Sequence, residues 1–206
     1  MIVAACALFF GTVPAEAALI TIEIEAVVDF VEDSHNYLEG KIKVGDTITG
    51  WYTYDTSTPD SASSNPTVGR YEHHTPPCGI SLTAGGFEFK TNAANVDFLV
   101  GIANNVTSGG LHDSYWIQSY NNLPLSNGVL VDDISWSLRD YSATALSSID
   151  LPTTAPVLED WQSGNLLRLH GVKWIYKVDA HVTSAVPEPG TILLFGLVGL
   201  LLRKRC

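Results

Sequence analysis

The sequence predicts an all-β fold, an antiparallel β-sandwich of jelly-roll or immunoglobulin-like layout, with a signal helix at the N-terminus and a short hydrophobic helix at the C-terminus. Two observations on the central part of the chain predict the sandwich. Apolar residues recur at every second position, which is the period of a strand with one buried face. Charged residues make up only 16% of the chain, while glycine, serine, threonine and asparagine fill short connections between the apolar segments.

The first expected strand begins at Leu19. Every second residue from Ile20 to Phe30 is apolar, whereas the intervening positions include Thr21 and Glu23. This alternation is typical of a half-buried antiparallel strand. Further strands are expected at residues 46–54, 79–84, 87–91, 96–103, 114–120, 134–141, 166–170 and 172–182.

Turn-forming residues separate these strands. Gly85-Gly86 and Asn127-Gly128 accept positive φ and therefore favour tight reversals. The stretch from Asp55 to Pro66 is rich in proline, serine and aspartate and is expected to be a long loop. Residues 146–158 are expected to form either a helical turn or a proline-containing loop.

The charge of the chain argues against one class of partner. The sequence has 22 acidic and 11 basic residues, and the segment between the two terminal regions keeps 20 and 8 of them, a net charge of −12. Such a surface repels phosphate backbones, which argues against nucleic-acid binding. It attracts divalent cations or basic partners, although solubility outside the cell is the simpler explanation.

Cysteine is scarce in the central segment. Only Cys78 lies there, since Cys6 falls near the start of the chain and Cys206 is the last residue. An internal disulfide is therefore not expected in the mature domain. A single thiol in an oxidising compartment is either buried or available for an intermolecular bond.

Residues 1–17 are typical of a signal peptide. An uncharged apolar run spans residues 2–13, and the small residues that signal peptidase requires follow at Ala15, Ala17 and Ala18. Cleavage is expected after Ala17, with the bond after Ala18 as the alternative. A lipoprotein box ending at Cys6 is a weaker interpretation, because too few apolar residues precede the cysteine.

Residues 186–206 form a tail of three parts. The first is an extended entry in which two prolines oppose regular structure, Val186-Pro187-Glu188-Pro189. The second is an apolar run that ends at Leu202 and is shorter than the ~20 residues with which a helix crosses a bilayer. The third is the basic cluster Arg203, Lys204 and Arg205, which is expected to stay cytoplasmic. The tail therefore predicts a marginal membrane segment.

This tail resembles the PEP-CTERM sorting domain, because Pro187-Glu188-Pro189 fits the signature tripeptide and the apolar and basic parts follow in the family's order. In that family an exosortase, a membrane protease-transpeptidase of bacteria that make extracellular polysaccharide, recognises the tail and is expected to cut near the tripeptide. The resemblance implies export across the inner membrane, transient anchoring there, and delivery to the cell envelope, the outer surface or the exterior. Cys206 departs from the usual all-basic end.

A softer resemblance covers roughly residues 20–183. The stretches 50–60, 69–71 and 82–89 are similar to a domain common among other PEP-CTERM proteins, and this likeness carries no activity over to the chain. The expected organisation is a signal peptide at residues 1–17, a β-sandwich ectodomain at 18–185 and a sorting and anchoring segment at 186–206.

No catalytic residues are assigned. His112-Asp113-Ser114 contains the residue types of a hydrolase triad, but consecutive residues cannot form the triad's geometry. His73, His74 and Cys78 are zinc-ligand types, yet adjacent residues of an extended chain point to opposite faces.

Paired carboxylates make calcium the one metal that the sequence leaves open, because hard cations prefer flexible oxygen ligands. Asp132 and Asp133 are the weak candidates, and Asp55 with Asp60 and Glu159-Asp160 are further pairs. None of them matches an EF-hand loop, so the sequence requires no metal and no other cofactor.

Aromatic residues are the candidates for ligand binding. The chain has five tryptophans and eight tyrosines, which can stack on sugar rings when exposed, although most are expected in the core. Trp51 and Tyr71 flank the longest loop and are favoured as an exposed pair.

The expected function is a non-enzymatic structural, adhesive or polysaccharide-associated module at the cell surface. The alternative is an envelope hydrolase or lyase acting on polysaccharide, which requires two carboxylates roughly 5 to 10 Å apart across a groove. A third interpretation is that the protein is a substrate of the sorting system and that its sequence indicates no other function.

Overall fold

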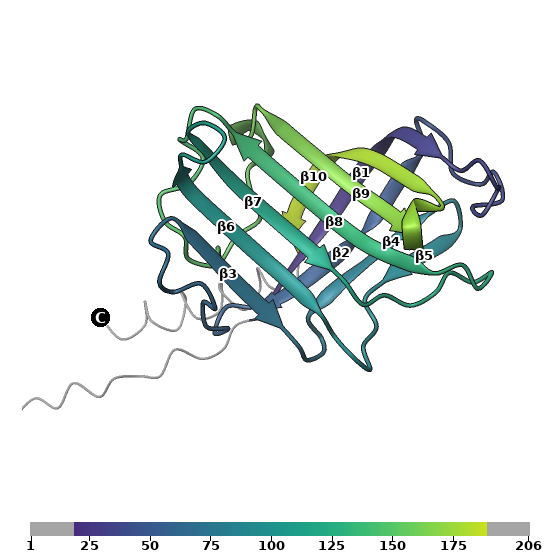
Figure 1. The fold of residues 1–206 in the computed structure, drawn as a ribbon, viewed down its shortest axis with the longest axis horizontal. Coiled ribbons are helices and arrows are strands. Elements are labelled where there is room, and N and C mark those ends of the chain that lie inside the picture. The colour runs from purple at the N-terminus through teal and green to yellow at the C-terminus, as the bar shows by residue number, and fades with distance from the viewer. Residues whose placement is uncertain (1–18, 189–206) are drawn as a thin grey trace, which may run out of the picture.

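The computed structural model describes residues 19–188, in which ten strands form one antiparallel sheet (Figure 1). The strands are β1 (Leu19–Glu32), β2 (Thr47–Asp55), β3 (Val68–His73), β4 (Gly79–Ala84), β5 (Phe87–Lys90), β6 (Phe98–Val106), β7 (His112–Ser119), β8 (Val131–Asp140), β9 (Gly164–Gly171) and β10 (Lys177–Pro187). Two short 3-10 helices, η1 (Leu158–Asp160) and η2 (Val172–Trp174), flank β9, and residues 19–188 contain no α-helix.

The sheet has the spatial order β3-β6-β7-β8-β9-β10-β1-β2-β4-β5. It curls so that β3, β6, β7, β8 and β9 form the front half in Figure 1, while β10, β1, β2, β4 and β5 lie behind them. The first and last strands are neighbours, and their pairing runs from Ile22 opposite Pro187 to Glu32 opposite Lys177. Since the strand order is linear, this ladder connects β1, β2, β4 and β5 to the other six strands.

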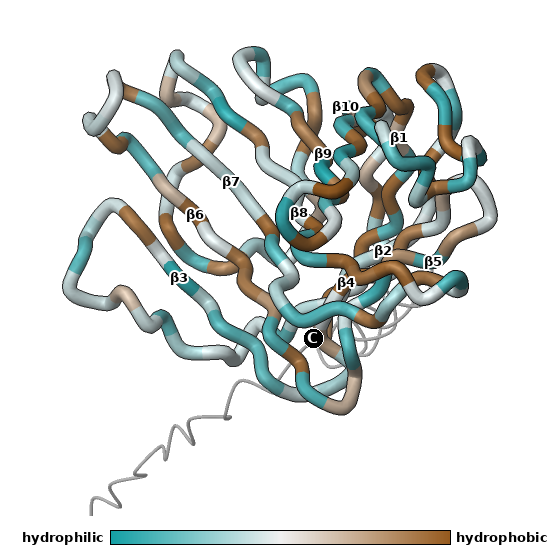
Figure 2. The backbone as a smooth tube through the Cα atoms, turned by 45° about the vertical axis from the view of Figure 1, so that its right-hand side comes forward, coloured by the Kyte–Doolittle hydropathy of each residue, from teal (hydrophilic) through white to brown (hydrophobic). Residues whose placement is uncertain are grey.

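Each strand buries alternate side chains on the inner face of the curl. On β1, Ile20, Ile22 and Ile24 are at most 4% exposed, whereas Glu23, between the last two, and Glu25, after them, are exposed. Figure 2 shows hydrophobic and hydrophilic residues intermixed along the strands of the curl, because each strand contributes side chains to both faces. The inner faces of the two halves therefore share one apolar core.

Two buried tyrosines meet across this core. The hydroxyl of Tyr52 on β2 lies 3.0 Å from the hydroxyl of Tyr115 on β7, and Trp136 on β8 packs edge-on against both rings. Burial raises the pKa of both tyrosines well above the ordinary value, so both stay neutral. Each hydroxyl is the other's hydrogen-bond partner in a region that excludes water.

The structure confirms the all-β class and the antiparallel pairing, but it does not show two separate sheets. β10 pairs with β1 on one side and with β9 on the other, so the ladder is continuous around the curl. The expected jelly-roll or immunoglobulin-like sandwich is thus replaced by one curled sheet. The helices expected at the two ends of the chain lie outside the described residues.

Two strand predictions differ from the structure. β3 was not predicted, because Gly69 and Arg70 interrupt its apolar alternation, yet it pairs with β6 along its whole length. The expected strand at 172–182 is wrong in its first part, since Lys173 and Trp174 have φ of 56° and 62° and Trp174 is 63% exposed. The backbone turns there, and β10 begins only at Lys177.

Removing one hydroxyl of the tyrosine pair tests how the two halves are held together. We expect Tyr115→Phe to lower the free energy of unfolding by about 1–3 kcal/mol, because the Tyr52 hydroxyl is left buried without a partner. Tyr52→Phe should cost a similar amount, and the double variant should cost clearly less than the sum of the two. Urea unfolding of the four proteins measures this coupling, and strictly additive costs would contradict it.

Candidate functional site

The outer face of the front half carries aligned rows of mainly small and polar residues. The register places the central row in the order Arg70-Gly101-Trp116-Ser137-Leu166, across β3, β6, β7, β8 and β9. The two flanking rows are Val68-Ala103-Ser114-Arg139-Gly164 and Glu72-Leu99-Gln118-Ser135-Arg168. Because many of these side chains are short, the face is hollowed into a groove of about 730 Å³ along β7, β8 and β9, here called the Trp116 groove.

Trp116 is held in position by a glycine. Its indole lies directly over Gly101 of β6, where an added Cβ would come within 2.0 Å of two ring atoms. A side chain at position 101 would therefore displace the ring. The alternation of β7 points Tyr115 into the core and Trp116 outward, where it is half-buried. The result is a preset aromatic surface in the groove, which suits stacking against a flat apolar ligand face.

Polar groups line the groove beside Trp116. The Gln118 amide donates to Asp133 over 2.8 Å, and the Ser135 hydroxyl donates to the other oxygen of the same carboxylate over 2.7 Å. The Tyr120 hydroxyl donates to Gln118 over 2.8 Å. These hydrogen bonds fix the orientation of the Gln118, Asp133 and Ser135 side chains next to an aromatic ring.

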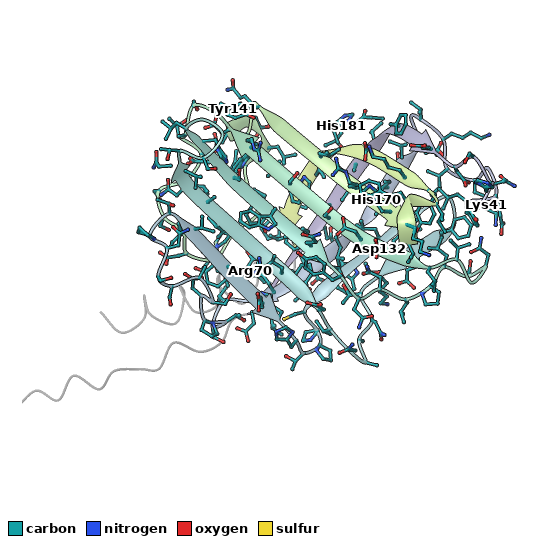
Figure 3. All side chains as sticks on the ribbon, viewed as in Figure 1. Lys41, Arg70, Asp132, Tyr141, His170 and His181 are labelled. Carbon is teal, nitrogen blue, oxygen red and sulfur yellow. The ribbon has the colours of Figure 1, made fainter. Side chains whose placement is uncertain are left out.

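The arginines of residues 19–188 all lie on this outer face, at positions 70, 139 and 168 (Figure 3 labels Arg70). Arg70 forms an ion pair with Glu72 at 2.7 Å and Arg168 with Asp179 at 3.3 Å. Arg139 has no carboxylate partner in the described part of the chain, and its guanidinium lies 5.9 Å from the ring centroid of Tyr141. The Arg139 guanidinium donates to the Tyr141 hydroxyl over 3.4 Å, so among residues 19–188 this arginine pairs with a neutral group and not with a carboxylate.

Two buried carboxylates close one end of the front half. Asp113 and Asp140 are opposite each other on β7 and β8, at 0% and 2% exposure. Asp113 accepts from the backbone amides of Asn105 (2.8 Å) and Leu146 (2.9 Å). The Ser142 hydroxyl and nearby loop amides hold the pKa of Asp140 at about 2. Both carboxylates therefore order the surrounding loops.

The neighbours of Asp113 do not form a triad. Nδ1 of His112 lies 2.8 Å from the Gly110 carbonyl oxygen, and Ser114 points to the opposite face of β7 from Asp113. The three consecutive residues thus have separate environments, as the extended backbone requires.

His73 and His74 lie on opposite faces of the sheet edge, as their adjacency predicts. His73 is 3% exposed and packs between Tyr54 and Phe98, whereas His74 is exposed. Cys78 is buried, and burial raises the pKa of its thiol. Of the two alternatives for this thiol, the structure thus shows burial.

The prediction that Trp51 and Tyr71 form an exposed pair is wrong for Tyr71. Tyr71 is only 6% exposed, because it alternates with the outward Arg70 and Glu72, and its hydroxyl donates to the Ile149 carbonyl over 2.8 Å. Trp51 is 38% exposed on the rear half, between two grooves of about 330 and 310 Å³. Sequence reasoning ranked Trp116 below this pair, although the alternation of β7 already separates it from Tyr115.

The proposed calcium ligands are not gathered around one point. Asp132 and Asp133 lie on β8 and not in a turn, and both Asp133 oxygens accept side-chain hydrogen bonds. Asp55 and Asp60 accept from amides of their own loops, and Glu159 and Asp160 lie exposed in η1. Residues 19–188 contain no group of three or more histidine, cysteine or acidic side chains that could hold a metal ion.

Several expected sites fall outside the described residues. These are the signal-cleavage residues Ala15, Ala17 and Ala18, the second signature proline Pro189, and the basic residues Arg203, Lys204 and Arg205. Within residues 19–188, no helix has the length and apolar character needed to cross a bilayer. Val186, Pro187 and Glu188 are described, at the end of β10 and just beyond it.

Comparison with known proteins identifies the tail. Residues 185–205 match the family described as the PEP-CTERM protein-sorting motif. The motif implies that the protein is exported, processed by an exosortase and placed in the cell envelope or at the cell surface. No match was found among curated proteins or among solved structures.

The buried His73 makes stability depend on pH. Burial, assisted by the neighbouring His74, lowers the pKa of His73 to about 4, while Asp55 opposes this shift. The unfolded chain, with a histidine pKa of about 6.5, binds the proton more readily, so stability is full above that pH and is lost as the pH falls towards 4.

We expect the melting temperature to decline between pH 6.5 and pH 4. Protonation of His73 should lower the free energy of unfolding by up to about 3 kcal/mol over this window. In His73→Gln, which cannot titrate, the decline over this window should be shallower. Thermal unfolding by circular dichroism across the window measures the difference. Parallel curves for the two proteins would contradict the assignment.

Proposed function

We propose that the ectodomain of this exported protein binds an extracellular polysaccharide along the Trp116 groove, without cleaving it. The observation that carries the proposal is the indole of Trp116, preset over Gly101 in a groove of about 730 Å³. Sugar rings have apolar faces that stack on an indole and hydroxyl groups that exchange hydrogen bonds with side chains such as Gln118 and Ser135.

The shape of the site favours a polymer over a small ligand. The groove follows three adjacent strands and includes Tyr141 just after β8, so its polar and aromatic groups are spread along a track. A chain of sugars can occupy several weak contacts at once, and their sum supports binding where a single contact is weak. A location at the cell surface supplies contact with such polymers.

Arg139 suggests that the polymer carries carboxylates. Its guanidinium has no acidic partner among the described residues and lies in the groove near Tyr141, so a uronate carboxylate is a fitting partner. The net charge of −12 opposes a densely charged polymer. We therefore propose a polysaccharide in which uronate residues alternate with neutral sugars.

Binding is proposed in preference to hydrolysis or elimination because of the carboxylates. Asp133 is the one acidic residue that lines the groove in the described part of the chain, and Gln118 and Ser135 occupy its oxygens. The buried pair Asp113 and Asp140 accepts hydrogen bonds from loop amides. Glycoside hydrolysis generally uses two carboxylates facing one sugar linkage.

Substitution of Trp116 tests the proposed site. We expect Trp116→Ala to weaken binding to the producing cells' extracellular polysaccharide at least tenfold, about 1.4 kcal/mol. Gly101→Ala should weaken binding as well, because the added Cβ displaces the indole without removing it. Trp51→Ala, at the exposed tryptophan of the rear half, is the matched control and should bind normally. Affinity electrophoresis measures all four proteins, and loss confined to Trp51→Ala would refute the site.

The charge of the polymer is tested at Arg139. We expect Arg139→Ala to weaken binding of hyaluronan, an alternating uronate polymer, about fivefold at low salt, with Arg139→Lys retaining part of the affinity. Binding of neutral dextran should be equal in the wild type and both variants. Isothermal titration at two salt concentrations provides the readout. Equal hyaluronan affinity in the wild type and Arg139→Ala would contradict a carboxylate contact.

A further inference from the structure

The sorting motif begins inside the folded sheet. The matched residues start at 185, whereas β10 continues to Pro187. Ala185, Val186 and Pro187 are opposite Ile24, Glu23 and Ile22 of β1. One residue further on, the Glu188 amide donates to the Thr21 carbonyl over 3.0 Å. The first four residues of the motif are thus part of the ectodomain's central ladder.

The signature proline fits this ladder because of where its nitrogen points. In antiparallel pairs, hydrogen-bonded and non-hydrogen-bonded positions alternate. Since Glu188 is bonded to Thr21, the alternation makes Pro187 opposite Ile22 a non-hydrogen-bonded pair, and Val186 opposite Glu23 a bonded one. The nitrogen of Pro187, which carries no hydrogen, therefore points away from β1, and no hydrogen bond to β1 is lost. β10 ends at this proline, as expected of an entry in which prolines oppose regular structure, but Pro187 itself still lies opposite Ile22 in the ladder.

On the side of β10 that faces β9, a side chain replaces part of the backbone pairing. Its pairing with β9 ends at Ala180 opposite Leu167. The Asn165 side chain then bonds both backbone groups of Val182, with its amide 2.7 Å from the carbonyl and its oxygen 3.1 Å from the amide nitrogen. Beyond Val182, a groove of about 370 Å³ separates the loop at 154–159 from the strand end. Residues 183–188 therefore depend on β1 for their hydrogen bonds.

The spacing to the apolar run is short. Ile192 opens that run, so residues 188–191 are the whole connection, at most about 14 Å of extended chain. The Glu188 amide makes the last hydrogen bond of the ladder that the structure describes, so a protease that cuts C-terminal to Glu188 does not need to break the described pairing. To use bonds before Glu188 it must first peel the end of β10 from β1, which costs the pairing free energy.

We infer that folding of the ectodomain sets the position of the processing cut. The exosortase cuts C-terminal to Glu188, at a bond between Glu188 and Ile192, and the mature ectodomain keeps Val186 and Pro187 as the end of β10, with Glu188 just beyond it. In this step one amide C–N bond breaks. Its carbonyl carbon bonds to water or to an acceptor amine, whose proton passes to the amino group of the released tail. This inference rests on processing of the motif and is independent of polysaccharide binding.

The mature C-terminus is the direct test. We expect intact-mass measurement of the protein purified from exosortase-bearing cells to give a last residue between 188 and 191. A terminus at residue 185, 186 or 187 would overturn the inference, and so would recovery of an uncut tail. Binding of polysaccharide by the same sample reports on the proposed function separately.

Hydrogen exchange tests the docking of the motif without the exosortase. On the full chain in detergent micelles, we expect the amides of Val186 and Glu188 to exchange at least tenfold more slowly than those of the loop at 146–150. Val186→Pro removes a bonded amide and should release Glu188 to the loop's rate. Pro187→Ala, the matched control at the adjacent unbonded position, should leave Glu188 protected. Loop-like exchange of Glu188 in the unaltered chain would overturn the docking.

A linker insertion tests its effect on processing. Six glycine and serine residues inserted between Ala185 and Val186 move the tripeptide out of the sheet and keep residues 186–206 intact. We expect processing several-fold faster than normal, because peeling is no longer needed. The same insertion after Gly109, in an exposed turn, is the control and should process at the normal rate. An unchanged or slower rate for the first insertion would contradict the inference.

Discussion

The ladder between β1 and β10 is the constraint on which the rest of the structure depends. It brings the first and last segments of the described chain together and makes ten strands into one curled sheet. Only with this ladder in place do the inner faces of the two halves meet, so that Tyr52 reaches Tyr115 across the core. The outer surface inherits its shape from the same curl, because the rows around Trp116 exist only when β6 to β9 are held in register.

Period-two alternation was sufficient to predict most of the strands, because burial on one face leaves that mark in the sequence. The structure confirms β4 at residues 79–84 as predicted and places most of the others within a few residues. Alternation does not encode which strands pair, so the continuous sheet was missed. It also fails where backbone dihedral angles decide, as at Lys173 and Trp174. The site was harder to predict, because it depends on Gly101 standing opposite Trp116, a relation between residues on different strands.

The groove shows how an acidic protein can present a locally different surface. Many acidic residues of the protein lie on loops and outer faces, and several of them form ion pairs with lysine or arginine, as Glu72 does with Arg70. Arg139 lies beside aromatic groups and has no carboxylate partner among the described residues, so the field near the groove differs from the long-range field of the domain. Buried carboxylates such as Asp113 serve the architecture instead, since they order the loops at one end of the sheet. The same residue type thus has separate structural and surface roles.

The placement of Pro187 has a consequence for how such a tail can pass between proteins in evolution. A strand offers the neighbouring chain a backbone amide only at every second residue, so a proline at an intervening position removes nothing that the partner strand needs. The signal can therefore be appended to any carrier that finishes on a β-strand, provided that the graft keeps the right parity. A shift of one residue would put the proline where a donor is required and would loosen the junction, so parity is a compatibility rule for new carriers.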